Sequence, residues 1–258
     1  MRKVLFGIAA AALATTPALA ADLAPAAAPM YYKAPPVMAP QTWTGFYLGG
    51  DIGGAWSHTD GSWGGLAGVN PTSGGENGSS FLGGAHVGYD YQFAPSWVIG
   101  VEGDWTWTHA GGSNSQTWTL AGTGTPIPGS ATTMNATVDW LASIRGRLGY
   151  LITPSVMAYV TGGAAWGGIH YGATASDPAA GYLASTAFNN TSDGFVVGGG
   201  LEWAMTTHWS IRAEYLYYRL DSGQSALAPS NVVGIGPSSF GWGHTSVDVA
   251  RAGLSYKF

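Results

Sequence analysis

The sequence predicts an all-β fold, an eight-stranded antiparallel up-and-down barrel that spans a membrane. Three observations support this fold class. Only 9% of the 258 residues are charged, against about 25% in soluble domains. No internal apolar run reaches the roughly 18 residues of a membrane helix. From residue 43 onward, apolar side chains recur at every second position, in segments about as long as a tilted membrane strand.

The composition excludes several classes of protein. The chain has no cysteine, which rules out a disulfide scaffold and a cysteine zinc site. It has 9 basic and 14 acidic residues, and no cluster of Lys or Arg beyond Arg2 and Lys3. We therefore expect no nucleic-acid partner.

The N-terminus has the pattern of an export signal. Arg2 and Lys3 precede an apolar stretch at 4–13, and Ala18, Leu19 and Ala20 supply a small-x-small cleavage site. We predict a cleaved signal peptide at 1–20. The alternative is a retained helical anchor, because 4–21 is uncharged, although two threonines and a proline at 15–17 argue against it.

The next segment, 21–42, is rich in alanine and proline. Proline removes backbone donors and favours extended polyproline II, so this segment is predicted as a mobile periplasmic linker. Binding of a partner is the alternative role. The barrel is then expected over 43–258.

Eight strands are predicted, and one uncharged apolar face defines them. Their ranges are 44–56, 81–93, 97–108, 137–150, 156–166, 195–203, 209–217 and 249–258. In chain order the defining side chains are Phe46, Leu48 and Ile52; Val87, Tyr89 and Tyr91; Trp97, Ile99 and Val101; Val138, Trp140 and Ile144; then, after an alanine- and glycine-rich fifth segment of ambiguous facing, Val197, Leu201 and Trp203; Ile211, Ala213 and Tyr215; and Ala252, Leu254 and Tyr256.

The opposite faces of these strands collect charged side chains. They are Asp51, Asp90, Glu102, Asp104, Asp139, Arg145, Arg147, Glu202, Arg212, Glu214, Arg251 and Lys257. An eight-stranded barrel is just wide enough for side chains to fill its lumen. Since buried charges must be paired, we expect an ion-pair network that plugs the barrel. The alternative is a narrow, weakly cation-selective ion path lined by the same groups.

The connections alternate between short turns and long polar loops. The short turns are 94–96, 151–155 and 204–208, and the long loops are 57–80, 109–136, 168–194 and 220–246. Tryptophans gather at the strand ends, at positions 43, 97, 203 and 209 on one side and 56, 107 and 166 on the other. This arrangement is typical of an outer-membrane barrel with two aromatic girdles. A soluble lipocalin-like barrel would need polar outward faces instead.

No motif predicts a catalytic, metal or cofactor site. His58, His109, His170 and His244 lie near the outer strand ends, but no spacing supports a metal site. His86 faces the lumen, yet no G-x-S-x-G elbow accompanies it, and no phosphate-binding loop is present. We therefore expect no enzymatic activity.

Four segments resemble a known family. They are WTGFYLGG at 43–50, YVTGGAAWG at 159–167, RAEY at 212–215 and the terminal GLSYKF at 253–258. Together they resemble the OmpA-like β-barrels of alphaproteobacterial outer membranes, often described as outer membrane immunogenic or porin-family proteins. The resemblance implies an outer-membrane location and no agreed catalytic site. It also implies that the barrel-assembly machinery reads the C-terminal strand through Tyr256 and Phe258.

Arg219 is a candidate lipid contact. Alternation from 209–217 places it on the lipid face, just beyond the apolar band, where a long basic side chain can reach a lipopolysaccharide phosphate. The alternative is an ion pair with Asp221. Apolar spots in the long loops either contact host or envelope surfaces or fold over the barrel mouth.

These patterns predict a structural or surface-interaction protein of the cell envelope. The alternative is a small porin for passive diffusion of ions or small solutes.

Overall fold

The computed structural model describes residues 42–221, 223–233 and 235–258. The predicted signal peptide and the predicted linker, up to residue 41, lie outside the described residues. Nine strands form: β1 (Gly45–Trp63), β2 (Thr72–Ala94), β3 (Trp97–Gln116), β4 (Ala131–Thr153), β5 (Val156–Asp177), β6 (Tyr182–Ala204), β7 (Trp209–Asp221), β8 (Gln224–Ala228) and β9 (Ser238–Lys257). No helix among the described residues is long and apolar enough to cross a membrane.

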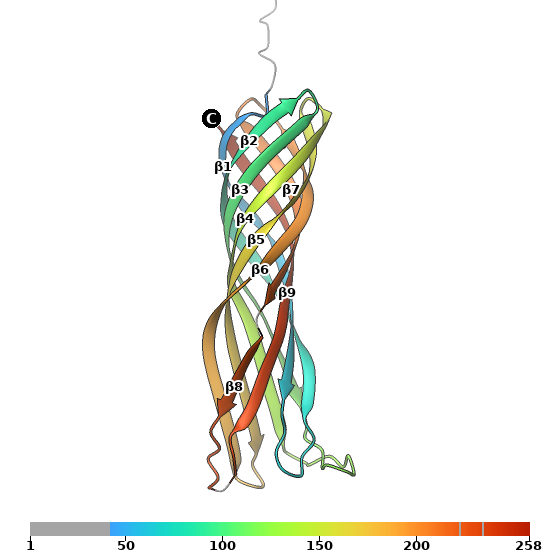
Figure 1. The fold of residues 1–258 in the computed structure, drawn as a ribbon, viewed down its shortest axis with the longest axis vertical. Coiled ribbons are helices and arrows are strands. Elements are labelled where there is room, and N and C mark those ends of the chain that lie inside the picture. Colours follow the sequence, from blue (N-terminus) through green and yellow to red (C-terminus); the bar gives the residue numbers. More distant parts are fainter. Residues whose placement is uncertain (1–41, 222, 234) are drawn as a thin grey trace, which may run out of the picture. The chain divides into compact units, whose positions relative to one another are not determined.

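The strands close into a ring (Figure 1). Each of β1 to β6 pairs antiparallel with the next strand, β7 pairs with β9, and β9 pairs with β1. This eight-membered ring confirms the predicted fold class. Within the described residues the short β8 pairs with β9 alone, alongside residues 238–242. Over residues 182–192, which precede the part of β6 that pairs with β7, β6 has a ladder to β5 but to neither β7 nor β8 within the described residues. We call this gap in the hydrogen bonding the β6–β8 seam.

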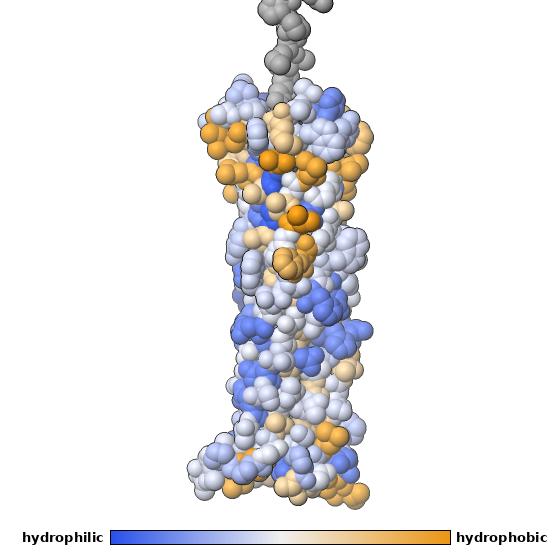
Figure 2. Space-filling view, turned by 180° about the vertical axis from the view of Figure 1, so that it is seen from behind, coloured by the Kyte–Doolittle hydropathy of each residue, from blue (hydrophilic) through white to orange (hydrophobic). Residues whose placement is uncertain are grey.

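The alternation places apolar side chains outside near the end that carries the C-terminus. Phe46, Leu48 and Ile52 of β1 are exposed on the wall, whereas Asp51 between them is buried. On the face shown in Figure 2, hydrophobic side chains gather toward this end and hydrophilic ones cover the wall beyond it. An uncharged, apolar outer band is what a barrel in hydrocarbon requires.

The long loops predicted from the sequence are wrong, because most of their residues form strands. β1 continues to Trp63 and β6 begins at Tyr182, so the connections shrink to 64–71, 117–130, 178–181 and 229–237. The alternation continues in these extensions with its polarity reversed. Polar residues such as Ser113 face outward, whereas Trp63 and Tyr171 are buried inside. An apolar outward face therefore identifies each strand only within the apolar band, and the strand residues beyond the band have the pattern of a polar loop.

The interior is filled in three zones. At the C-terminal end a small apolar cluster includes Trp43, Met157 and Tyr159. The middle zone is charged. The far end holds a large apolar core in which Trp63 stacks on Trp118 with ring centroids 4.7 Å apart.

Candidate functional site

The charged zone brings together ten of the twelve charged residues expected in the lumen. They are Asp51, Asp90, Glu102, Asp104, Arg145, Arg147, Glu202, Arg212, Glu214 and Arg251. Alternate positions of adjacent strands carry them, so the ring of strands points them at one another.

Glu102 lies at the centre of this network. All four arginines reach its carboxylate: Arg145 and Arg212 donate hydrogen bonds to it, and Arg147 and Arg251 lie 3.6 and 3.9 Å away. Glu214 accepts from Arg145 at 2.9 Å and lies 2.7 Å from Arg251. Charge-assisted bonds of this kind, made on several sides of each group, compensate for the removal of the charges from water.

Two tyrosines complete the network, and because they are uncharged, a pattern of charged residues does not reveal them. Tyr47 donates to Glu102 at 2.8 Å and accepts from Arg147 at 2.9 Å. The Arg147 guanidinium lies 4.1 Å from the ring centroid of Tyr159, whose hydroxyl donates to Glu214 at 3.2 Å. Tyr47 is four residues before Asp51 on β1, so strand alternation places both side chains on the lumen face. This alternation is the feature of the sequence that predicts Tyr47 inside the barrel. The sequence does not define the facing of Tyr159, because its strand is rich in glycine and alanine.

His86 connects Asp51 of the network to a further buried side chain, that of Ser255. Its Nδ1 lies 2.7 Å from Asp51, and its Nε2 lies 2.8 Å from the Ser255 hydroxyl. The order acid–histidine–serine is that of a hydrolase triad. However, Ser255 is 2% exposed, and a Cβ built on Gly49 would lie 2.5 Å from the His86 ring. The space around the serine is occupied, so a substrate has no access to it.

The lumen position predicted for Asp139 is wrong. The ladders on both sides of β4 shift register, between Trp107 and Ala110 on β3 and between Val138 and Trp140 on β4 itself. Such a bulge reverses the facing of the residues beyond it. Asp139 therefore points outward, 2.9 Å from His109, while Val138 is buried inside.

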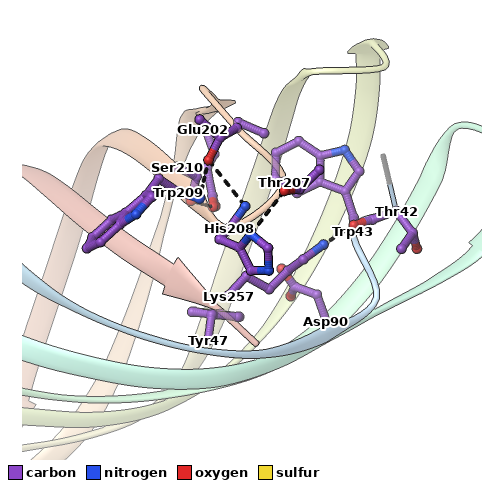
Figure 3. A pocket seen from close by; sticks show the side chains of 12 residues that line it. Thr42, Trp43, Tyr47, Asp90, Glu202, Thr207, His208, Trp209, Ser210 and Lys257 are labelled. Carbon is purple, nitrogen blue, oxygen red and sulfur yellow. Dashed lines mark hydrogen bonds between the residues drawn. The ribbon is translucent and has the colours of Figure 1, made fainter. Parts of the chain in front are cut away.

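Lys257, the remaining residue expected in the network, forms no ion pair with it among the described residues. It lies at the rim, where β9 ends, and its ammonium donates to the Thr42 carbonyl (Figure 3). No carboxylate of the described residues lies within 4.0 Å of it. Arg147 already contacts the neighbouring acids Asp90 and Glu202, at 3.6 and 2.6 Å.

Trp43 closes the same rim. Its side chain is buried, and its indole N–H donates to the Pro154 carbonyl at 3.1 Å. The hollow beside it, lined by Glu202, His208 and Lys257 among others, measures about 20 Å³ (Figure 3). That volume is enough for about one water molecule.

The outer wall carries a second set of polar groups, directly beyond the apolar band. We call it the outer-wall belt: His58, Asp60, His109, Asp139, His170, Asp193, Arg219, Asp221, His244 and Asp248. The histidines come from four different strands and each has its own partner. His58 lies 2.8 Å from Asn77, His109 2.9 Å from Asp139, His170 2.5 Å from Asn189 and His244 2.9 Å from Asp221. They do not converge on a common point, and the described residues contain no group of three ligands suited to a metal.

Arg219 is exposed on the wall, as the alternation predicted. Its alternative partner, Asp221, contacts His244 instead. Among the described residues no carboxylate lies within ion-pair distance of the Arg219 guanidinium. At the opposite end Tyr256 packs edge-on against Phe258, with ring centroids 5.2 Å apart.

The family described as outer membrane protein beta-barrel domain matches the chain over residues 6–258. This protein belongs to that family. The match confirms the outer-membrane location predicted from the sequence, and two alphaproteobacterial relatives, described next, confirm the resemblance.

Two relatives of this outer-membrane barrel agree with that assignment. The 31 kDa outer-membrane immunogenic protein of Brucella melitensis is 30% identical over 273 residues, covering 100% of both chains. The 22 kDa outer membrane protein of Rhizobium leguminosarum bv. viciae is 30% identical over 195 residues, covering 73% of this chain and 72% of its own. Among solved structures, the outer membrane protease OmpT of Escherichia coli aligns with a TM-score of 0.50 at 10% identity, over 86% of this chain and 99% of its own. That likeness concerns the fold alone.

The family assignment orients the barrel. In outer-membrane barrels short turns face the periplasm and longer connections face outward. The rim closed by Trp43 is therefore periplasmic, and the outer-wall belt lies on the outer side of the apolar band.

Proposed function

We propose that this protein is a closed barrel with a structural and surface-interaction role in the cell envelope, and not an enzyme. The observation that supports it is the filled interior: an apolar cluster at the periplasmic rim, the charged network in the middle and an aromatic core at the outer end. Different side chains fill each zone and exclude water from it. Removing a side chain from one zone therefore leaves the lumen closed at the other two.

The charged zone supports a structural role because its members hold distant strands together. Arg145 on β4 contacts Glu102 on β3 and Glu214 on β7, and Arg251 on β9 contacts Asp104 on β3. Removing one partner of such a buried pair typically costs about 3–5 kcal/mol. The network therefore stabilises the closed ring from within.

A small cation-selective porin is the second candidate. The observation in its favour is the charge of the network, in which six carboxylates face four guanidinium groups. Rings of acidic side chains favour cations in channels. This function would need a continuous path past Glu102 and through the aromatic core.

Planar-bilayer conductance of the purified protein separates the two candidates. We expect no stable single-channel steps, since all three zones are filled. A Trp43→Ala variant is the matched control for the periplasmic rim, and it should remain silent because the other zones stay closed. Reproducible steps from the wild-type protein would favour the porin.

We also propose three kinds of contact for the surface. Arg219 binds a phosphate of lipopolysaccharide, the C-terminal strand engages the barrel-assembly machinery through Tyr256 and Phe258, and the outer connections meet host or envelope ligands. The burial of Trp63, Trp118 and Phe240 in the core supports a lid formed by much of the outer end. Val233 and Leu227 are exposed and are therefore free to contact host or envelope ligands.

Retention of lipopolysaccharide by the wild type and by Arg219→Ala tests the lipid contact. The variant should retain less lipid after detergent washing. Equal retention would remove the proposed site.

A further inference from the structure

The outer-wall belt lies at a defined height. His58 is two residues beyond Trp56 on the outer face of β1, and His109 is two residues beyond Trp107 on β3. Two residues of a tilted strand rise by roughly 5 Å. Since tryptophan prefers the headgroup depth, the belt begins where lipid phosphates and the adjoining sugars are found.

The belt is exposed and is acidic at neutral pH. The side chains of His58, His109 and His244 are 48%, 80% and 56% exposed, and those of their acidic neighbours Asp60, Asp139 and Asp221 are 74%, 44% and 70% exposed. With neutral imidazoles the belt holds five aspartates against Arg219 alone, an excess of four negative charges. Asp193 lies directly opposite Asp221 across β6 and β7, where like charges repel.

The surroundings of each histidine are defined on both sides of its strand. His58 faces Asp60 on its own strand, Asn77 on β2 and Ser246 on β9, with Glu76 buried beneath the wall. His109 faces Asp139 on β4, and the neighbouring Thr108 contacts the Phe81 carbonyl on β2. His170 faces Thr137 on β4 and Asn189 on β6.

On β9, His244 faces Asp221 of β7, and Gly243 next to it lies against Asp60 of β1. Asp248 on the same strand accepts from Tyr215. Arg219 is the one permanent cation of the outer wall among the described residues. The other charged groups that face the histidines are aspartates.

We propose that the four histidines make the attachment of this belt to lipopolysaccharide phosphates responsive to pH. At neutral pH the excess of aspartates repels the phosphates, and divalent cations must bridge the two. Imidazoles gain protons as the pH falls from about 8 to about 5. Four added positive charges then balance the aspartates and provide donors for direct bonds to phosphate. The inference rests on the proposed position of Arg219 in the same phosphate layer.

Binding of the full-length barrel in detergent to purified rough lipopolysaccharide tests this. The assay contains EDTA and is run at about pH 5 and about pH 8. The wild type should bind about tenfold or more tightly at the lower pH, a difference of about 1.4 kcal/mol. A variant with His58→Gln, His109→Gln, His170→Gln and His244→Gln should bind equally weakly at both. In a parallel assay in which calcium replaces EDTA, the binding of both proteins at the higher pH should be stronger.

Controls separate the sources of the effect. His208→Gln, at an exposed periplasmic turn, should keep the wild-type response. Dephosphorylated lipopolysaccharide should not bind, and inorganic phosphate at equal phosphate concentration should not compete. Competition by inorganic phosphate would indicate a simple anion site and would overturn the lipid-layer assignment.

The outcomes also separate this inference from the proposed function. If the wild type binds equally at both pH values, or if the four-histidine variant keeps the response, the inference is wrong while the Arg219 contact can stand. If neither the wild type nor Arg219→Ala binds lipopolysaccharide at any pH, both are wrong. Unfolding in urea shows whether the four-histidine variant keeps the wild-type fold. The four single histidine variants provide a second test, and each should show a smaller change of lipopolysaccharide binding with pH than the wild type.

Discussion

Glu102 contacts four arginines that come from three strands. Its one carboxylate therefore interacts with more guanidinium groups than an isolated ion pair would allow. At the residue scale the lumen is therefore a network in which four of the six acids, Asp51, Glu102, Asp104 and Glu214, each lie within ion-pair distance of at least two arginines. Arg145 in turn lies within ion-pair distance of three carboxylates, those of Glu102, Asp104 and Glu214. When one side chain of such a network is removed, the remaining buried charges lose a partner, and this destabilises the protein.

Arg145→Ala should destabilise the barrel by about 3 kcal/mol or more, because it leaves buried carboxylates without a partner. Urea unfolding followed by tryptophan fluorescence in detergent measures this. Arg219→Ala is the matched control, since it removes an exposed guanidinium and should change the free energy of unfolding by less than about 0.5 kcal/mol. Equal stabilities for the two variants would contradict a structural network.

Glu76, in the part of β2 beyond the membrane, should make stability depend on pH. Its side chain is 2% exposed and one carboxylate oxygen has no hydrogen-bond partner. Burial raises its pKa to about 7; a backbone bond and His58 oppose the rise and Asp60 adds to it. The raised pKa means that the folded state holds the proton more tightly than the unfolded state. The stabilisation is complete below the unfolded pKa and is lost as the pH rises through about 7.

Glu76→Gln should therefore match the wild type near about pH 4, below the unfolded pKa, and be more stable near about pH 8, by roughly 1–3 kcal/mol at about 1.4 kcal/mol per pKa unit. Parallel urea titrations at the two pH values measure the difference. A constant difference across this range would show that the Glu76 carboxyl does not titrate there.

At the element scale the sequence could predict each strand where it crosses the membrane, because hydrocarbon forces one face to be apolar and uncharged. It could not predict the extensions, where water on the outside and packing on the inside reverse that pattern. Trp63 and Tyr171 belong to the core for this reason, although a lipid-face rule places them in loops. The bulge next to Asp139 was hidden too, since no residue type marks a shift of register.

The β6–β8 seam should exchange amide hydrogens quickly. Leu183 of β6 points its amide across the seam to Asn231, and Ser185, Ala187, Asn189 and Thr191 share its parity. Within the described residues their amides have no ladder partner, so about half of the amides in 185–191 should exchange early. Hydrogen exchange of β5, which is paired on both sides, is the internal reference. Protection equal to that of β5 would mean that β6 and β8 pair in solution.

The whole molecule combines a lipid-facing barrel with a water-facing one on a single ring of strands. Family, fold class and location could be predicted because they depend on alternation and on the terminal motifs. The sequence could predict which charged residues face the lumen with Glu102, but not which of them contact one another. Those contacts depend on how far each strand is shifted along its neighbour around the ring. The contact between His86 and Ser255 could not be predicted, because 169 positions separate the two residues in the sequence.

The boundary between the two parts predicts unequal tolerance to charge. Ile52→Lys, on the lipid face, should destabilise the folded protein in lipid vesicles by about 2–4 kcal/mol. Ser113→Lys, on the outward face of the extension, should have little effect because that wall is hydrated. Guanidinium titrations in vesicles measure both, and equal costs would place the boundary elsewhere.

The reversal of polarity along the strands also sets how deeply the barrel is immersed. From Phe46 to Trp56 the apolar face of β1 spans about 24 Å along the membrane normal for a tilt near 45°, close to the roughly 25 Å band of such barrels. Moving the molecule inward by one residue pair would bring His58 into hydrocarbon, and moving it outward would expose apolar wall at the periplasmic rim. Because the interior is packed and cannot deform to compensate, a bilayer of a different thickness would have to thin or thicken around this barrel.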